Sequence, residues 1–177
     1  MKFGNRKGQA VMEYLITYGL ALFVILIVLG ILVAVVIPTL KVPEGCQFTQ
    51  PGFSCNQKQH VIVADKTDNT VTALFYLSND QGSAVNITGV ICSAKPAGSV
   101  EKSEITALTP SITLAPGGAY SFNSTGCTDE NGVGVIMTPN SNFKGSIAIK
   151  YKRMDDVSGA PERMAVATLT GNVQESD

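Results

Sequence analysis

The sequence predicts an α+β protein, in which one long N-terminal hydrophobic α-helix is followed by an antiparallel β-sandwich head of the immunoglobulin-like type. Two observations predict this architecture. Residues 14–40 carry no charge, and an apolar run of that length is more than a membrane-spanning helix needs. Beyond Cys46, short stretches alternate apolar and polar residues between turn signals, which is typical of the strands of a sandwich.

The helix is expected over residues 9–40. At 1.5 Å per residue its charge-free part would be about 40 Å long, compared with roughly 30 Å for the hydrocarbon core of a bilayer. The basic residues Lys2, Arg6 and Lys7 precede it, so the positive-inside rule places the leader in the cytoplasm and the head outside. The predicted parts are a leader at 1–8, a transmembrane helix at 9–40, a linker at 41–45 and an extracellular head at 46–177.

A cutting site is expected before the apolar run. A secretory signal peptide is cut after its apolar segment, next to small residues, but here the run continues to Pro38 without such a pattern. Cleavage between Gly8 and Gln9 would instead remove the basic leader and keep the helix. A helix without its cytoplasmic anchor is one that can leave the bilayer.

Three residues of the helix are candidates for assembly contacts. Gly19 and Gly30 lie eleven residues apart, close to three full turns, so they share one helix face on which another helix can approach closely. Glu13 lies at the edge of the apolar run, where an ionised carboxylate is costly unless it has a partner.

Residues 6–15, Arg-Lys-Gly-Gln-Ala-Val-Met-Glu-Tyr-Leu, resemble the class III signal peptide of archaeal type IV pilins. The resemblance implies that a prepilin peptidase cuts after Gly8. Gln9 would then be the first residue of the mature chain and Glu13 its fifth, where type IV pilins carry a glutamate. It further implies a homo-oligomeric helical filament, with an assembly ATPase and a platform protein as partners. The chain would lie in the cell membrane before assembly and in an extracellular pilus afterwards.

The chemistry of the residues agrees with that resemblance. Cleavage would create an α-amino group at Gln9, with a pKa near 8 in water. Glu13 lies one helical turn further along, so the amine of a neighbouring subunit shifted along the axis could reach it. Pairing relieves much of the several kcal/mol that a lone charge costs in a water-poor core. An N-terminal Gln can also cyclise, and the neutral terminus could then only form hydrogen bonds.

All four cysteines lie beyond the helix, and no C-x-x-C pair occurs: Cys46, Cys55, Cys92 and Cys127. An even number there indicates two disulfides in an oxidising compartment. Three pairings are possible. We favour Cys46–Cys55, which closes a short loop, together with Cys92–Cys127, which ties a strand to a distant loop; free buried thiols are the alternative.

Two N-glycosylation sequons, at Asn86 and Asn123, also favour an extracellular head. The head is expected to contain eight strands, bounded by turns rich in Gly, Pro, Asn and Asp. They are His60–Ala64, Val71–Ser78, Val85–Ala94, Ile105–Leu114, Ala119–Phe122, Val133–Met137, Ser146–Arg153 and Met164–Val173.

No constellation of residues indicates catalysis, so the chain is not expected to be an enzyme or to need a cofactor. His60 is the only histidine and is interpreted as an ordinary strand-end residue. No G-x-S-x-G sequence accompanies it. The acid pairs at 129–130 and 155–156 lack the oxygen-rich spacing of a calcium loop, so no metal is expected. A net charge of −1 without a basic run argues against nucleic acid as a partner.

The leading expectation is a structural pilin subunit of a type IV-like pilus used for adhesion or surface attachment. One alternative is a minor pilin or tip protein, whose head binds a surface or a solute. Another is a single-pass membrane protein that never polymerises. An archaellin is a further relative, but Glu13 and the absence of a Gly-rich segment after the cut favour a pilin.

Overall fold

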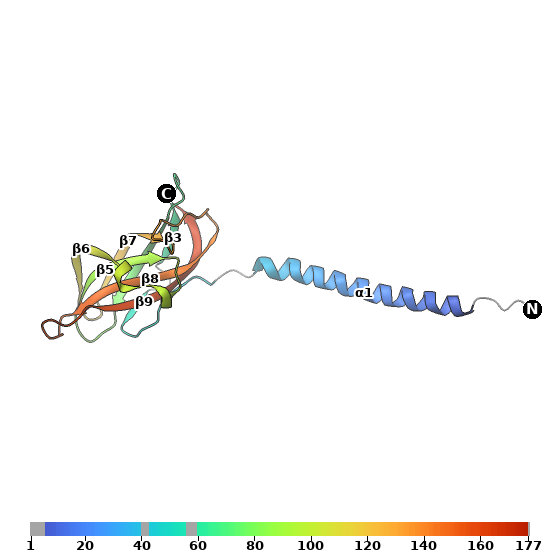
Figure 1. Ribbon diagram of the computed structural model, residues 1–177, viewed down its shortest axis with the longest axis horizontal. Helices are drawn as coiled ribbons and strands as arrows, with labels where there is room; N and C mark the ends of the chain where they lie inside the picture. Colours follow the sequence, from blue (N-terminus) through green and yellow to red (C-terminus); the bar gives the residue numbers. More distant parts are fainter. Residues whose placement is uncertain (1–5, 40–42, 56–59, 177) are drawn as a thin grey trace, which may run out of the picture. The chain divides into compact units, whose positions relative to one another are not determined.

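The computed structural model describes residues 6–39, 43–55 and 60–176 and, within the helix, the side chains of residues 11–35 (Figure 1). The chain forms two compact units, residues 1–41 and residues 42–177. The first contains the helix and the second contains the β-rich head.

The helix α1 extends over Arg6–Thr39. It therefore begins three residues before the expected start and includes the backbone of Gly8 and Gln9. Its segment Val11–Val35 is long and apolar enough to cross a membrane, judged by length and composition. At 1.5 Å per residue its 25 residues span about 38 Å.

The described residues of the head form nine strands, several of which are labelled in Figure 1. They are β1 (Gly45–Phe48), β2 (Phe53–Cys55), β3 (Val61–Ala64), β4 (Val71–Asn79), β5 (Val85–Ser93), β6 (Thr106–Leu114), β7 (Ala119–Thr128), β8 (Asn142–Arg153) and β9 (Arg163–Glu175). Two short 3-10 turns, Ala97–Ser99 and Lys102–Glu104, lie between β5 and β6.

Six of the strands close into a mixed barrel in the order β9-β3-β4-β7-β5-β8. The pairs β3–β9 and β5–β7 are parallel, and we call these two parallel pairs the seams. The prediction of an antiparallel immunoglobulin-like sandwich was therefore wrong, because the head is a mixed barrel with two parallel strand pairs. Strands β1, β2 and β6 are additional, and pair with β9, β4 and β5.

The barrel closes because two strands change partner along their length. Residues 119–126 of β7 pair with β4, whereas Cys127 and Thr128 pair with β5. Residues 163–172 of β9 pair with β8, whereas residues 173–175 pair with β3. Alternation of apolar and polar residues reports which face of a strand is buried, but it does not report which strand lies alongside.

The strand expected at Val133–Met137 is not formed. Val133 and Ile136 are more than 60% exposed, and this segment contributes only the isolated bridges Thr70↔Ile136 and Thr128↔Gly134. Conversely, β1 and β2 were not expected, because four and three residues are too few to establish an alternating pattern.

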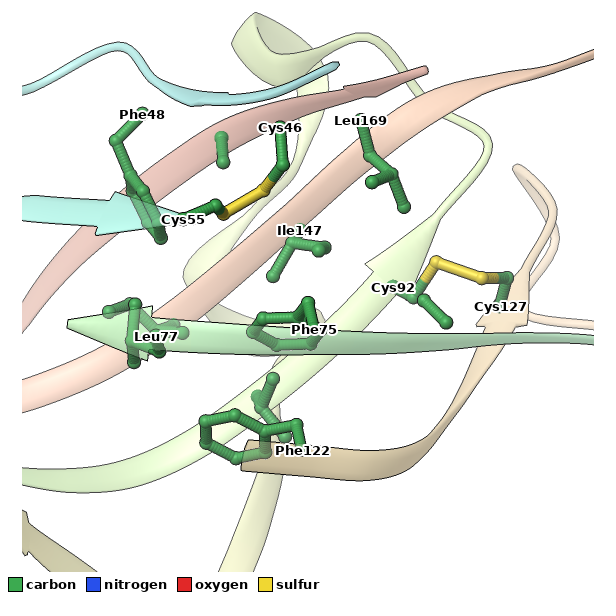
Figure 2. Close-up of a cluster of buried hydrophobic side chains, with 14 of the residues drawn as sticks. Cys46, Phe48, Cys55, Phe75, Leu77, Cys92, Phe122, Cys127, Ile147 and Leu169 are labelled. Atoms are coloured by element: carbon green, nitrogen blue, oxygen red, sulfur yellow. A yellow bond between two sulfur atoms is a disulfide. The ribbon is translucent and has the colours of Figure 1, made fainter. Parts of the chain in front are cut away.

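The interior of the barrel is an apolar core that includes both disulfides (Figure 2). Phe75 of β4 stacks on Phe122 of β7, with ring centroids 4.8 Å apart, and Ile147 and Leu169 are fully buried beside them. A second, smaller cluster covers the outer face of β8 and β9, where the segment between β5 and β6 packs on Ala148 and Val166. Strand β8 is consequently buried on both faces at its centre.

The buried side chain of Asn79, at the end of β4, connects the turn that follows β4 with the turn that follows β6. It is fully buried, and its Nδ2 donates to the backbone carbonyls of Ser83, Leu114 and Ala115 at 3.0, 3.2 and 3.1 Å. Its Oδ1 accepts from the backbone N–H of Gln81 at 3.1 Å. Because a buried amide is costly unless it is bonded, these contacts fix both turns against the barrel.

Candidate assembly helix and head surface

The first turns of α1 carry the expected cutting site and Glu13. The side chains of Gly8 and Gln9 lie outside the described side chains, although their backbone is helical. Glu13 is exposed one turn further along, and it forms no ion pair with any described residue. Thr17 Oγ1 donates to the Glu13 carbonyl at 2.8 Å, so the polar hydroxyl is satisfied within the helix.

The apolar side chains of α1 are exposed on every face. From Val11 to Val35 the large apolar residues are 45–66% exposed, and this all-round apolar surface is typical of a helix surrounded by lipid or other helices. Nothing lies within 4 Å of the position that a Cβ would take on Gly19 or Gly30. Both positions are therefore open to a neighbouring helix, as their spacing suggests.

Two disulfides join Cys46 to Cys55 and Cys92 to Cys127, which are the pairings favoured from the sequence. Their Cα atoms lie 5.6 and 4.4 Å apart. The first links β1 to β2, close to where the head begins. The second lies in the β5–β7 seam, where Cys92 is the register partner of Cys127. Disulfides of this kind indicate an extracytoplasmic location.

The two sequons lie in different environments. Asn123 is exposed on β7, whereas Asn86 is the second residue of β5 and lies between its register partners Thr113 of β6 and Lys152 of β8. The Asn86 Oδ1 atom is buried without a hydrogen-bond partner. His60, immediately before β3, is buried, and its Nε2 lies 3.4 Å from the Thr170 carbonyl oxygen.

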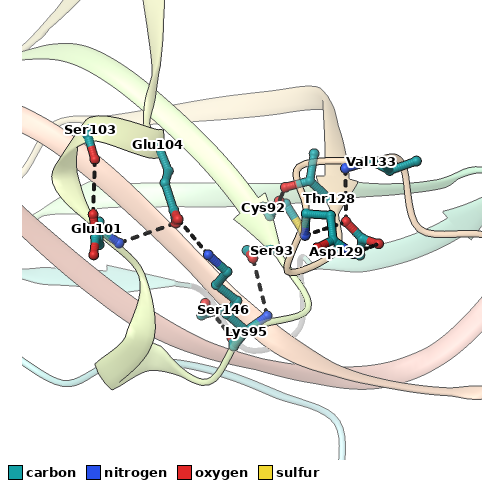
Figure 3. A network of polar contacts seen from close by, with 11 residues as sticks. Cys92, Ser93, Lys95, Glu101, Ser103, Glu104, Thr128, Asp129, Val133 and Ser146 are labelled. Atoms are coloured by element: carbon teal, nitrogen blue, oxygen red, sulfur yellow. Dashed lines mark hydrogen bonds and ion pairs between the residues drawn. The ribbon is translucent and has the colours of Figure 1, made fainter.

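The head also has a hollow of 370 Å³ between β5, the 3-10 turn Lys102–Glu104, the start of β6 and the loop after β7. Lys95 and Glu104 meet there at 2.5 Å (Figure 3). This hydrogen bond raises the pKa of Lys95 and lowers the pKa of Glu104. Ser146 Oγ donates to the Lys95 carbonyl at 2.8 Å, which fixes the backbone that carries the ion pair.

On the other side of the hollow, Asp129 folds back onto its own loop (Figure 3). Its Oδ1 accepts from the backbone N–H groups of Val133 at 2.9 Å and Asn131 at 2.8 Å. These bonds, led by that from Val133, lower the pKa of Asp129. Three charged groups of the hollow, Lys95, Glu104 and Asp129, thus form contacts that stabilise the loops around it.

This hollow could not be predicted from the sequence, since its ion pair joins residues nine apart across a proline. Across residues 6–39, 43–55 and 60–176, no three His, Cys, Asp or Glu side chains lie close enough together to hold a metal ion. Two of the four basic residues of β8 are paired with acids: Lys150 lies 3.8 Å from Glu162, and Arg153 lies 2.8 Å from Asp155.

In comparisons with known proteins, no family model, no curated protein and no solved structure matches this chain. Its function must therefore be argued from its own residues.

Proposed function

We propose that this chain is a structural pilin subunit, which polymerises into an extracellular type IV-like filament used for attachment to surfaces. The observation that carries the proposal is an exposed, charge-free segment of α1 that directly follows the expected cutting site and Glu13. The β-rich head with two disulfides supports it, because such a domain suits the outside of a cell.

The apolar surface of α1 must be shielded from water both before and after assembly. In the membrane, lipid covers it. When the leader with Lys2, Arg6 and Lys7 has been removed, the helix loses the charges that hold its end at the cytoplasmic face. Other copies of the same helix can then replace the lipid, with the open positions at Gly19 and Gly30 allowing close approach.

Glu13 would set the axial register of this assembly. Four residues of helix separate Gln9 from Glu13, which corresponds to about 6 Å along the axis. A neighbouring subunit displaced by that distance brings its N-terminal amine level with the Glu13 carboxylate. Because an unpaired charge in a water-poor helix bundle costs several kcal/mol, registers that leave Glu13 unpaired are disfavoured.

The test is electron microscopy of filaments sheared from cells that make the protein, combined with N-terminal analysis of the subunits. We expect filaments whose subunits begin at Gln9. A chain that begins at Met1 and is absent from filaments would support a non-polymerising membrane protein. If the chain were found only at the ends of filaments, this result would support a tip protein.

The role of Glu13 is tested separately with the variant Glu13→Gln. This variant should still be cut and displayed but should form few or no filaments. Tyr18→Phe is the matched control, because it changes a polar group in the same helix without removing a charge. Normal filaments from Glu13→Gln would refute the register role and leave the remainder of the proposal standing.

A further inference from the structure

We propose that Asn123, and not Asn86, carries an N-linked glycan in the folded head. This requires only that the head lies outside the cytoplasm, which the proposed function also requires. The two sequons are similar in sequence, Asn-Ile-Thr and Asn-Ser-Thr. The fold distinguishes them through strand pairing, burial and the hydrogen bonds of each amide.

A register shift in β7 exposes the Asn123 sequon. Ala73 of β4 pairs with Thr125, and Phe75 pairs with Phe122, so two residues of β7 lie opposite one of β4. In regular alternation Asn123 and Ser124 would point to opposite faces. Here both are exposed, while Phe122 and Thr125 are buried. Irregularities of this kind redirect side chains outward.

The surroundings of Asn123 leave room for a sugar and leave the reacting atom available. Its exposed neighbours on β7 are Ser121 and Ser124, which are both small. Ser121 Oγ donates to Asn123 Oδ1 at 2.6 Å. Asn123 Nδ2, the atom to which a glycan is joined, has no hydrogen-bond partner among the described residues. Along this part of β7, the edge away from β4 pairs with no described strand.

Asn86 differs in strand pairing and burial. Its strand is paired on both sides, with Thr113 and Lys152 as register partners. Its side chain is only partly exposed and its Oδ1 is buried, so a glycan on the same amide would be crowded by the neighbouring residues of β6 and β8. In the folded sheet the sequon hydroxyl, Thr88 Oγ1, lies 2.9 Å from Glu162 Oε1 and 3.2 Å from the Lys150 carbonyl oxygen, and it donates its one proton to one of them. A glycan at Asn86 would therefore disfavour formation of this sheet.

The transfer itself would be carried out by an oligosaccharyltransferase acting on a lipid phosphate-linked sugar. Asn123 Nδ2 attacks the anomeric carbon of the sugar and forms the C–N bond, while the C–O bond to the lipid phosphate breaks. The amide loses one proton to a base of the transferase, and the lipid phosphate leaves. Thr125 is buried in the folded head, so its hydroxyl is read before β7 closes against β4.

The experiment is intact-mass and peptide mass spectrometry of the full-length protein, produced in cells with an extracytoplasmic oligosaccharyltransferase. We expect the added mass on the Asn123 peptide, its complete loss in Asn123→Gln, and no change of added mass in Asn86→Gln. Ser124→Ala is the matched control, because it alters the neighbouring exposed residue and retains the sequon.

Circular dichroism and intact disulfides establish that each variant is folded. A glycan on the Asn86 peptide of folded protein, or an unmodified Asn123 peptide, would overturn the proposal. Neither result depends on filament formation. Filaments of unglycosylated subunits would overturn this inference alone, whereas glycosylated protein that never enters filaments would overturn only the proposed function.

Discussion

The covalent link across the β5–β7 seam can be removed by the double substitution Cys92→Ala/Cys127→Ala, which leaves the other residues of the apolar core unchanged. This seam consists of only two register pairs, Cys92↔Cys127 and Ser93↔Thr128, and the disulfide adds a covalent link to the first of them. Without the disulfide, the barrel closes on this side only through this short backbone pairing and side-chain packing.

The expected loss follows from the length of the closed loop. The two cysteines are 35 residues apart, for which the chain-entropy relation gives about 3.8 kcal/mol of unfolding free energy. The Cys46–Cys55 loop spans 9 residues, and the same relation gives about 2.6 kcal/mol. The seam disulfide should therefore stabilise the head by roughly 1 kcal/mol more than the disulfide between β1 and β2.

Urea unfolding of the head, residues 43–177, measures both values. With a slope of about 2 kcal/mol per M, the Cys92→Ala/Cys127→Ala variant should lose roughly 2 M in unfolding midpoint, and Cys46→Ala/Cys55→Ala roughly 1.3 M. Equal losses, or a larger loss for the short loop, would refute the argument from loop length.

Three further predictions concern the head. Asn79→Ala should lower the unfolding free energy by about 3 kcal/mol, because several buried backbone groups lose their partner, whereas the exposed control Asn142→Ala should be near neutral in the same urea titration. Gly145→Ala should cost about 1–3 kcal/mol by overpacking, since its Cβ would meet the backbone of β5; Gly126→Ala, where the space is open, should cost less in thermal unfolding. The pKa of Asp129 is lower in the folded head than its ordinary value of 3.8, so ionised Asp129 stabilises the fold at pH values above 3.8, and this contribution is lost as the pH falls through the lower, folded pKa. Asp129→Asn should therefore flatten the dependence of the urea midpoint on pH below about 4. An unchanged pH profile would contradict this prediction.

The sequence allowed us to predict those elements in which burial produces a regular pattern of apolar residues. The charge-free run predicted α1, and the expected strand Ser146–Arg153 lies within β8. Parallel pairing at the two seams could not be predicted, since a strand that changes partner halfway keeps the same alternation. Val133 and Ile136 misled the prediction, because apolar residues on an exposed loop resemble a short strand.

For the candidate sites as well, features that depend on residue type and spacing could be predicted from the sequence, whereas features that depend on strand pairing could not. Cysteine number and spacing were enough to favour the observed disulfides, and the two sequons were visible as tripeptides. Their inequality was not visible, because it depends on the register shift opposite Leu74 and on strands on both sides of Asn86. Asn79 was also missed, since a buried asparagine that joins two turns looks like any turn residue in sequence.

The Cys46–Cys55 bond determines how the head responds to a pulling force. Tension applied between α1 and a distant part of the head enters the domain at β1, which pairs with β9 over Gly45–Phe48. If that pairing ruptures, the chain can be drawn out only as far as Cys46, because the disulfide then carries the load directly to β2 and through it to β4. The residues between Cys46 and Cys55 are then bypassed by the load, so an overloaded head extends only up to Cys46 before the force reaches β4.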